Sequence, residues 1–119
     1  MTMGERAVAL HAPGTNCAQC VLRAASEYTG LSEETAMKIA EGFGGGVRSG
    51  EICGAVSGAV MALGLCGKAK QTRAFVEDFK EFYNSCRCAE LKGVSGIPCD
   101  DLIEHAADKL EEVLNNGNL

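Results

Sequence analysis

Apolar residues recur at spacings of three and four along most of the chain, which is the pattern of amphipathic helices. The longest uncharged run covers residues 52–65 and carries Gly54, Gly58 and three alanines at helical spacing. Small residues at that spacing let two helix backbones approach closely, and the run is too short for the ~20 residues that cross a bilayer. We therefore expect residues 52–65 to form a buried central helix, with Cys53 in its first turn and no membrane insertion.

The remaining helices are predicted from apolar stripes and from start and stop signals. They cover residues 4–12, 17–29, 33–41, 71–83 and 99–114. In the fourth of these, one side carries Phe75, Val76, Phe79 and Phe82. No stretch alternates as a strand does, and no repeat or linker divides the chain. The sequence thus predicts one all-α domain over residues 1–119, a compact bundle of about five to six helices around the central helix.

Composition narrows the classes of partner. The net charge is −5, with 11 basic and 16 acidic residues, which argues against nucleic acid and anionic membranes. The first residues lack an apolar stretch with a basic flank, so no secretory signal is expected and a cytoplasmic location follows by default. Thiols are normally kept reduced there. Seven cysteines in such a protein therefore require a reason beyond packing.

Three cysteines, Cys17, Cys53 and Cys99, lie at the predicted first turns of different helices. Unpaired N–H groups and the helix dipole stabilise a thiolate at that position. Cys88 follows a helix and stands beside Arg87, in a segment that is free to fold back. We hypothesise that these four cysteines converge at one end of the bundle.

The simplest alternative is that the cysteines are separate buried thiols, each filling a small hole. Cys20 and Cys66 fit this alternative because both fall on apolar helix faces, and Cys86 fits either interpretation. The C-x-x-C formed by Cys17 and Cys20 has no βαβ unit around it, so a thioredoxin-like assignment is weak. Val21 stands where a c-type haem attachment requires histidine, and no haem is expected.

Other familiar motifs are incomplete. Cys86 and Cys88 are one residue too close for a second C-x-x-C, and His11 and His105 are isolated, so structural zinc is only an alternative. The glycine-rich residues 42–50 are expected to be an irregular loop. They lack the Gly-Lys-Ser/Thr of a P-loop and do not match G-x-G-x-x-G, so no nucleotide is expected. No Ser/His/Asp arrangement is evident, which leaves an enzymatic activity open.

Several motifs occur together in order along the chain. They are Asn16-Cys17-Ala18-Gln19, Gly42-Phe43-Gly44-Gly45-Gly46, Cys53-Gly54-Ala55-Val56-Ser57-Gly58, Cys88-Ala89-Glu90-Leu91-Lys92-Gly93 and Cys99. In this combination the chain, from Asn16 to the last helix, resembles the C_GCAxxG_C_C family of redox-active proteins. The resemblance implies four key cysteines, here Cys17, Cys53, Cys88 and Cys99, and leaves the other three as extra. A similar domain occurs in split-Soret cytochromes, which carry an iron–sulfur centre besides haem.

The residues and the resemblance together favour a small redox protein. We expect electron transfer or redox sensing with a redox partner protein, through a two-iron, two-sulfur cluster bound by Cys17, Cys53, Cys88 and Cys99. Metal-free thiol–disulfide chemistry is the first alternative, with Cys17 or Cys53 as the attacking thiolate. A structural zinc site or an interaction module is the second. The small-residue face of residues 52–65 would also suit a homodimer.

Overall fold

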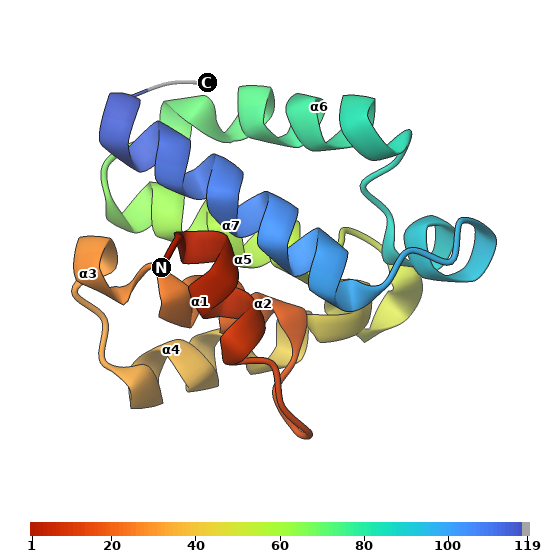
Figure 1. Cartoon of the computed structure of the whole chain (residues 1–119), viewed down its shortest axis with the longest axis horizontal. Coiled ribbons are helices and arrows are strands. Elements are labelled where there is room, and N and C mark those ends of the chain that lie inside the picture. The colour runs from red at the N-terminus through yellow and green to blue at the C-terminus, as the bar shows by residue number, and fades with distance from the viewer. Residues whose placement is uncertain (118–119) are drawn as a thin grey trace.

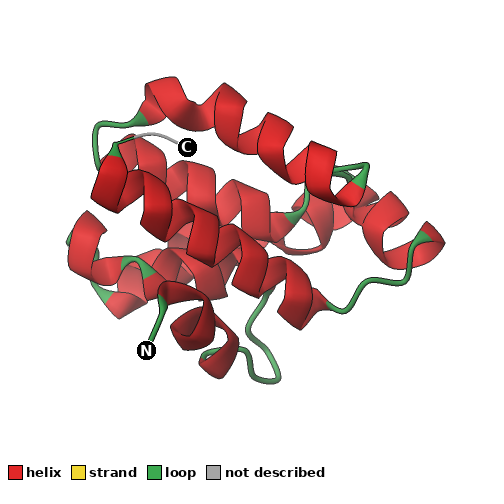
Figure 2. Ribbon diagram, turned by 45° about the horizontal axis from the view of Figure 1, so that its top comes forward, coloured by secondary structure: helices red, strands yellow, loops and turns green. Residues whose placement is uncertain are grey.

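The computed structural model describes residues 1–117, and within them it contains seven α-helices and no strand (Figure 1, Figure 2). The α-helices are α1 (Met3–Ala9), α2 (Cys17–Ala24), α3 (Ser26–Thr29), α4 (Glu33–Ala40), α5 (Gly54–Leu65), α6 (Thr72–Tyr83) and α7 (Cys99–Asn116). Shorter helical segments connect them: η1 (Glu41–Phe43), η2 (Gly46–Gly50), η3 (Ala69–Gln71) and η4 (Ala89–Val94). The all-α prediction is confirmed. The helices outnumber the expected five to six because the helix expected over residues 17–29 breaks at Ala25 into α2 and α3.

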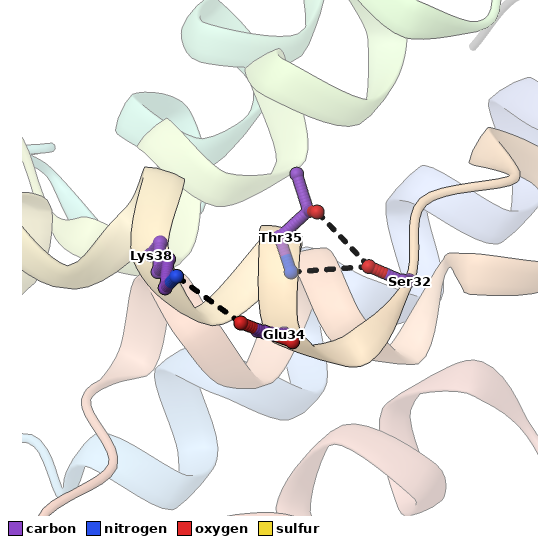
Figure 3. A network of polar contacts seen from close by, with 4 residues as sticks. All are labelled: Ser32, Glu34, Thr35 and Lys38. Atoms are coloured by element: carbon purple, nitrogen blue, oxygen red, sulfur yellow. Dashed lines mark hydrogen bonds and ion pairs between the residues drawn. The ribbon is translucent and has the colours of Figure 1, made fainter.

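Side-chain caps fix where the helices begin. The Asn16 side chain accepts the backbone N–H of Gln19 at 3.0 Å, and the Gln19 side chain accepts that of Asn16 at 2.8 Å. This capping box starts α2 at Cys17. Ser32 accepts the backbone N–H of Thr35 at 3.2 Å and starts α4 (Figure 3). Both starts agree with the sequence prediction, because a cap uses only groups within one turn.

Helix α5 packs against α2, α6 and α7 and forms the centre of the bundle. Its crossing with α2 is close: a Cβ atom on Gly58 would lie 2.6 Å from the carbonyl oxygen of Ala18, and one on Gly54 would lie 2.5 Å from the Cys17 sulfur. Only glycine fits these positions. The central helix is thus confirmed, and its small-residue face is used within the chain. Within residues 1–117, no helix combines the length and the hydropathy that crossing a membrane requires.

The central helix begins two residues later than expected. Cys53 precedes α5 as its N-cap and does not lie in the first turn. The reason is long-range: Ile52 forms an isolated antiparallel β-bridge with Arg87, and the extended backbone of the bridge delays the helix. The position of Cys53 is therefore set by a segment far away in sequence.

The core is built mainly from the long helices. Phe75 and Phe79 of α6 are buried, together with Ile103 and Leu110 of α7. Phe82, predicted on the same apolar side of α6, is 65% exposed, so that part of the prediction is wrong. Phe82 lies in the last turn of α6, where its ring contacts His105 with centroids 4.3 Å apart and its other side faces solvent.

The glycine-rich residues 42–50 are more ordered than expected. After η1, four consecutive residues adopt left-handed backbone conformations, with φ of 65°, 66°, 59° and 54° at Gly45, Gly46, Val47 and Arg48. Such conformations are strained for a β-branched residue such as Val47. A side chain at Gly46 would collide with the backbone of Glu51. The turn is therefore tightly folded, and it brings Gly45 to the start of α2.

Candidate functional site

Four of the seven cysteines line one small pocket where α2, α5, η4 and α7 begin. The pocket is lined by Cys17, Cys53, Cys88, Cys99, Gly45, Lys92 and Leu102, and we call it the four-cysteine pocket. Its volume is about 220 Å³ and its wall is mostly apolar. The predicted convergence of these four cysteines is therefore observed, whereas their role as ligands stays a prediction.

A short antiparallel bridge holds Cys53 and Cys88 at the pocket. The N–H of Cys53 donates to the carbonyl of Cys86 at 2.7 Å, and the N–H of Cys88 donates to that of Glu51 at 2.6 Å. The side chains of Arg87 and Glu51 pair across the same bridge at 3.3 Å. The backbone positions of both cysteines are thus fixed relative to each other.

Cys17 and Cys99 reach the pocket because each is the first residue of a helix. Asn16 caps the helix that Cys17 begins. Pro98 precedes Cys99 in an extended conformation and turns the chain into α7. Leu102, one turn further along α7, closes the apolar wall of the pocket. Both helix starts agree with the sequence prediction.

The thiols of Cys17 and Cys53 form a hydrogen-bonded pair. The hydrogen bond from Cys53 outweighs burial and lowers the pKa of Cys17 to about 6, and the N–H groups of Gly45 and Ala18 lower it further. The same hydrogen bond, together with burial, raises the pKa of Cys53. The interaction thus favours the thiolate form at Cys17 and the protonated form at Cys53.

The remaining two thiols of the pocket interact with this pair. Burial raises the pKa of Cys88, and the negative charges of Cys17 and Cys99 raise it further, whereas the charge of Lys92 lowers it. These four cysteines thus form an electrostatically connected group rather than separate buried thiols.

The other three cysteines do not line the pocket. Cys20 is fully buried in the core, where burial raises its pKa to about 11. Cys66 follows α5, is half-buried, and donates to the carbonyl oxygen of Tyr28 at 3.4 Å. Cys86 is buried beside the β-bridge. Cys20 matches the packing alternative, and none of the three is placed to replace a cysteine of the pocket.

Alkylation of the reduced, metal-free protein should distinguish Cys17 from Cys66. Because the pKa of Cys17 is lowered to about 6, its reaction rate with iodoacetamide should rise through that pH and level off near neutrality. Burial raises the pKa of Cys66 above its ordinary value of 9.0, so its rate should still rise in alkaline solution. Peptide mass mapping over a series of pH values measures both rates. A common midpoint for the two thiols would contradict the assignment of Cys17 as the thiolate.

The four thiols of the pocket match in number and kind the usual ligand set of a two-iron, two-sulfur cluster. Within residues 1–117, no group of three or more His, Cys, Asp or Glu side chains is arranged to hold one ion. His11 pairs instead with Asp100 at 2.6 Å. A two-iron cluster distributes four thiolates over two metal atoms, so its ligands surround a volume rather than a point. Four thiols around an apolar cavity of about 220 Å³ suit that requirement.

Three residues besides the cysteines line the pocket without being predicted as site residues: Gly45, Lys92 and Leu102, the last from the apolar stripe of α7. Gly45 has a signal in the glycine run 42–46, which predicts turns but not a hydrogen bond to Cys17. Lys92 has no signal beyond its place in the motif of residues 88–93. Both reach the pocket through long-range packing, which a local pattern does not encode.

The fold and the pocket define a small all-helical protein with a four-cysteine site. The chain belongs to the C_GCAxxG_C_C family, described as "Putative redox-active protein (C_GCAxxG_C_C)", whose family model matches residues 15–113. The match confirms the resemblance seen in the sequence and indicates redox activity as the general function. No curated protein and no solved structure matches the chain significantly.

Proposed function

We propose that this protein transfers electrons or senses redox state through a two-iron, two-sulfur cluster bound by Cys17, Cys53, Cys88 and Cys99. One observation carries the proposal: these four cysteines, from four separate segments, line the same small apolar pocket, while the other three do not. Two thiols suffice for disulfide exchange, whereas four thiolates are the usual ligand set of this cluster. A reducing compartment such as the cytoplasm would keep the thiols available.

The residues of the pocket would both hold and tune the group. When bound, the cluster supplies one-electron transfer at iron. The Cys17 sulfur accepts hydrogen bonds from the N–H groups of Gly45 and Ala18. Hydrogen bonds of this kind to ligand sulfurs stabilise the reduced state and so raise the reduction potential. Leu102 and the apolar wall limit the access of water. Another redox protein would serve as electron donor or acceptor.

A metal-free dithiol mechanism is the second candidate, and the hydrogen-bonded pair of Cys17 and Cys53 favours it. The Cys17 thiolate would attack one sulfur of a partner disulfide, forming a mixed disulfide and releasing the other sulfur as a thiolate. That thiolate takes the proton of Cys53. The Cys53 sulfur then attacks Cys17 and releases the second partner thiolate. The partner gains two electrons, and the protein is left with a disulfide between Cys17 and Cys53.

Analysis of metal and acid-labile sulfide, with a visible spectrum, tests the proposal on protein purified without oxygen. We expect iron and sulfide in equal amounts and absorbance in the visible range. A colourless protein that takes up neither after anaerobic reconstitution would contradict the cluster. The dithiol candidate then predicts that mild oxidation joins Cys17 to Cys53, which peptide mass mapping detects. Zinc alone would indicate a structural site.

A further inference from the structure

Lys92 is the one basic residue among the described residues that line the four-cysteine pocket. The rest of the lining consists of the four cysteines, Gly45 and Leu102. Lys92 belongs to the motif of residues 88–93, which begins with Cys88. Within residues 1–117, Lys92 is therefore the lining residue that carries a positive charge.

Hydrogen bonds to Ile97 restrain Lys92. The Lys92 Nζ donates to the carbonyl of Ile97 at 3.1 Å, and the Ile97 N–H donates to the carbonyl of Leu91 at 2.9 Å. Leu91 is fully buried, so the loop that follows η4 is anchored in the core. An exposed lysine usually samples many rotamers and contributes little electrostatically. The tether to Ile97 limits that freedom, although Lys92 is exposed.

A restrained cation favours the state of the pocket that carries more negative charge. Reduction adds negative charge in both candidate functions: one electron enters a four-thiolate cluster, or two electrons convert a disulfide into thiolates. The wall of the pocket is mostly apolar, so on that side the charge of Lys92 is screened less than the charge of a lysine that is surrounded by solvent.

We propose that Lys92 is the positioned counter-charge that raises the reduction potential of the four-cysteine pocket. This inference rests on the proposed function, because the pocket must be redox-active, but it applies to either redox couple. Lys92 neither binds the cluster nor reacts. Its ammonium stabilises the reduced state through space, and the hydrogen bond to Ile97 holds the side chain beside the pocket that Lys92 lines.

The first test uses the reconstituted protein and compares K92M, K92Q and K92R with the unsubstituted chain. Dithionite is the electron source: each dithionite ion is oxidised to two sulfite ions and reduces two clusters by one electron each. When the solution is held at a fixed potential, the ratio of reduced to oxidised cluster should be lower by about threefold to tenfold in both neutral variants. For a one-electron couple, a tenfold change in this ratio corresponds to a shift of about 59 mV in the reduction potential. K92R should keep most of the original potential because it keeps the charge.

K70M is the matched control. Lys70 is exposed in η3 and does not line the pocket, so K70M removes the same charge elsewhere on the surface. Its potential should be close to that of the unsubstituted chain, because exposed charges are screened by solvent and salt. Thermal melts followed by circular dichroism show that each variant is folded.

If no cluster assembles, the first proposed function fails, and Lys92 is tested on the second couple. The same variants are equilibrated with reduced and oxidised glutathione, and mass spectrometry measures the fraction with a disulfide between Cys17 and Cys53. The neutral variants should again favour the oxidised state. For this two-electron couple, a tenfold change in the ratio of reduced to oxidised protein corresponds to about 30 mV. Failure of the cluster and failure of the inference are thus separate results.

Four outcomes overturn the inference. The first is an unchanged potential in K92M and K92Q, and the second is an equal shift in K70M. The third is a fall in the reduction potential of K92R as large as that in K92M, because arginine keeps the positive charge. The fourth is loss of folding in both neutral variants, which would make Lys92 a structural residue. A pocket that forms neither redox couple would remove the inference together with the proposed function.

Discussion

Cys53→Ser is expected to lower the iron and sulfide content of the reconstituted protein, because affinity for the cluster should fall by at least about tenfold, the loss in metal affinity found even for residues that only support metal ligands. Cys53 is buried, with 2% of its surface exposed, and lines the four-cysteine pocket. A serine hydroxyl is a poor replacement because thiolate is the preferred ligand of iron in such clusters. The backbone bridge to Cys86 does not involve the sulfur, so the fold should survive the substitution.

Cys66→Ser is the matched control. It makes the same chemical change at a half-buried cysteine outside the pocket, whose thiol donates to the carbonyl of Tyr28. Serine can retain that donation, so iron, sulfide and the visible spectrum should stay close to those of the unsubstituted protein. Equal losses of iron and sulfide in the two variants would contradict the proposal that Cys53 is a ligand of the cluster. If the protein binds no metal, the same comparison is made with the reactivity of Cys17.

Gly58→Ala is expected to destabilise the protein by about 1–3 kcal/mol, the usual cost of overpacking a core. The added Cβ would lie 2.6 Å from the carbonyl oxygen of Ala18 and 3.2 Å from its Cα atom. Both are backbone atoms and cannot turn away as a flexible side chain can. The two helices must therefore separate, and Cys17, the residue before Ala18, must move with α2. Urea denaturation of the metal-free protein measures the change in free energy of unfolding.

Gly64→Ala provides the control in the same helix. Nothing lies within 4 Å of the Cβ that would be added at Gly64. Since alanine favours helix over glycine, this variant should be more stable by about 0.5–1 kcal/mol. A Gly58→Ala variant as stable as Gly64→Ala would show that the close crossing of α2 and α5 does not limit stability.

The close crossing of α2 and α5 matters for the four-cysteine pocket as well as for stability. Gly54 and Gly58 allow α2 to lie directly on α5, and this crossing places Cys17 against the backbone just after Cys53. Larger residues at these positions would separate the two cysteines whose thiols share a hydrogen bond. The small-residue face of α5 therefore serves the site as well as the core.

Sequence predictions succeeded where the evidence was local. Helices α2 and α4 begin at Cys17 and Glu33 as expected, because the Asn16 and Ser32 caps use groups within one turn of the chain. Predictions failed where a distant segment intervened. Cys53 precedes its helix because of the bridge between Ile52 and Arg87. The exposure of Phe82 likewise depends on where α6 ends relative to α7, which helical periodicity does not specify.

The sequence by itself determined that the protein is helical, where most helices begin, and that three cysteines stand at or next to helix starts. These properties follow from side-chain spacing and from hydrogen bonds within single turns. Only the tertiary structure decided that Cys17, Cys53, Cys88 and Cys99 share one pocket and that Lys92 joins them. It also decided that the pKa of Cys17 is lowered and that of Cys53 raised, because both shifts depend on the interaction between the two thiols. Contacts between segments far apart in sequence arise from the packing of whole helices, and no local pattern encodes them.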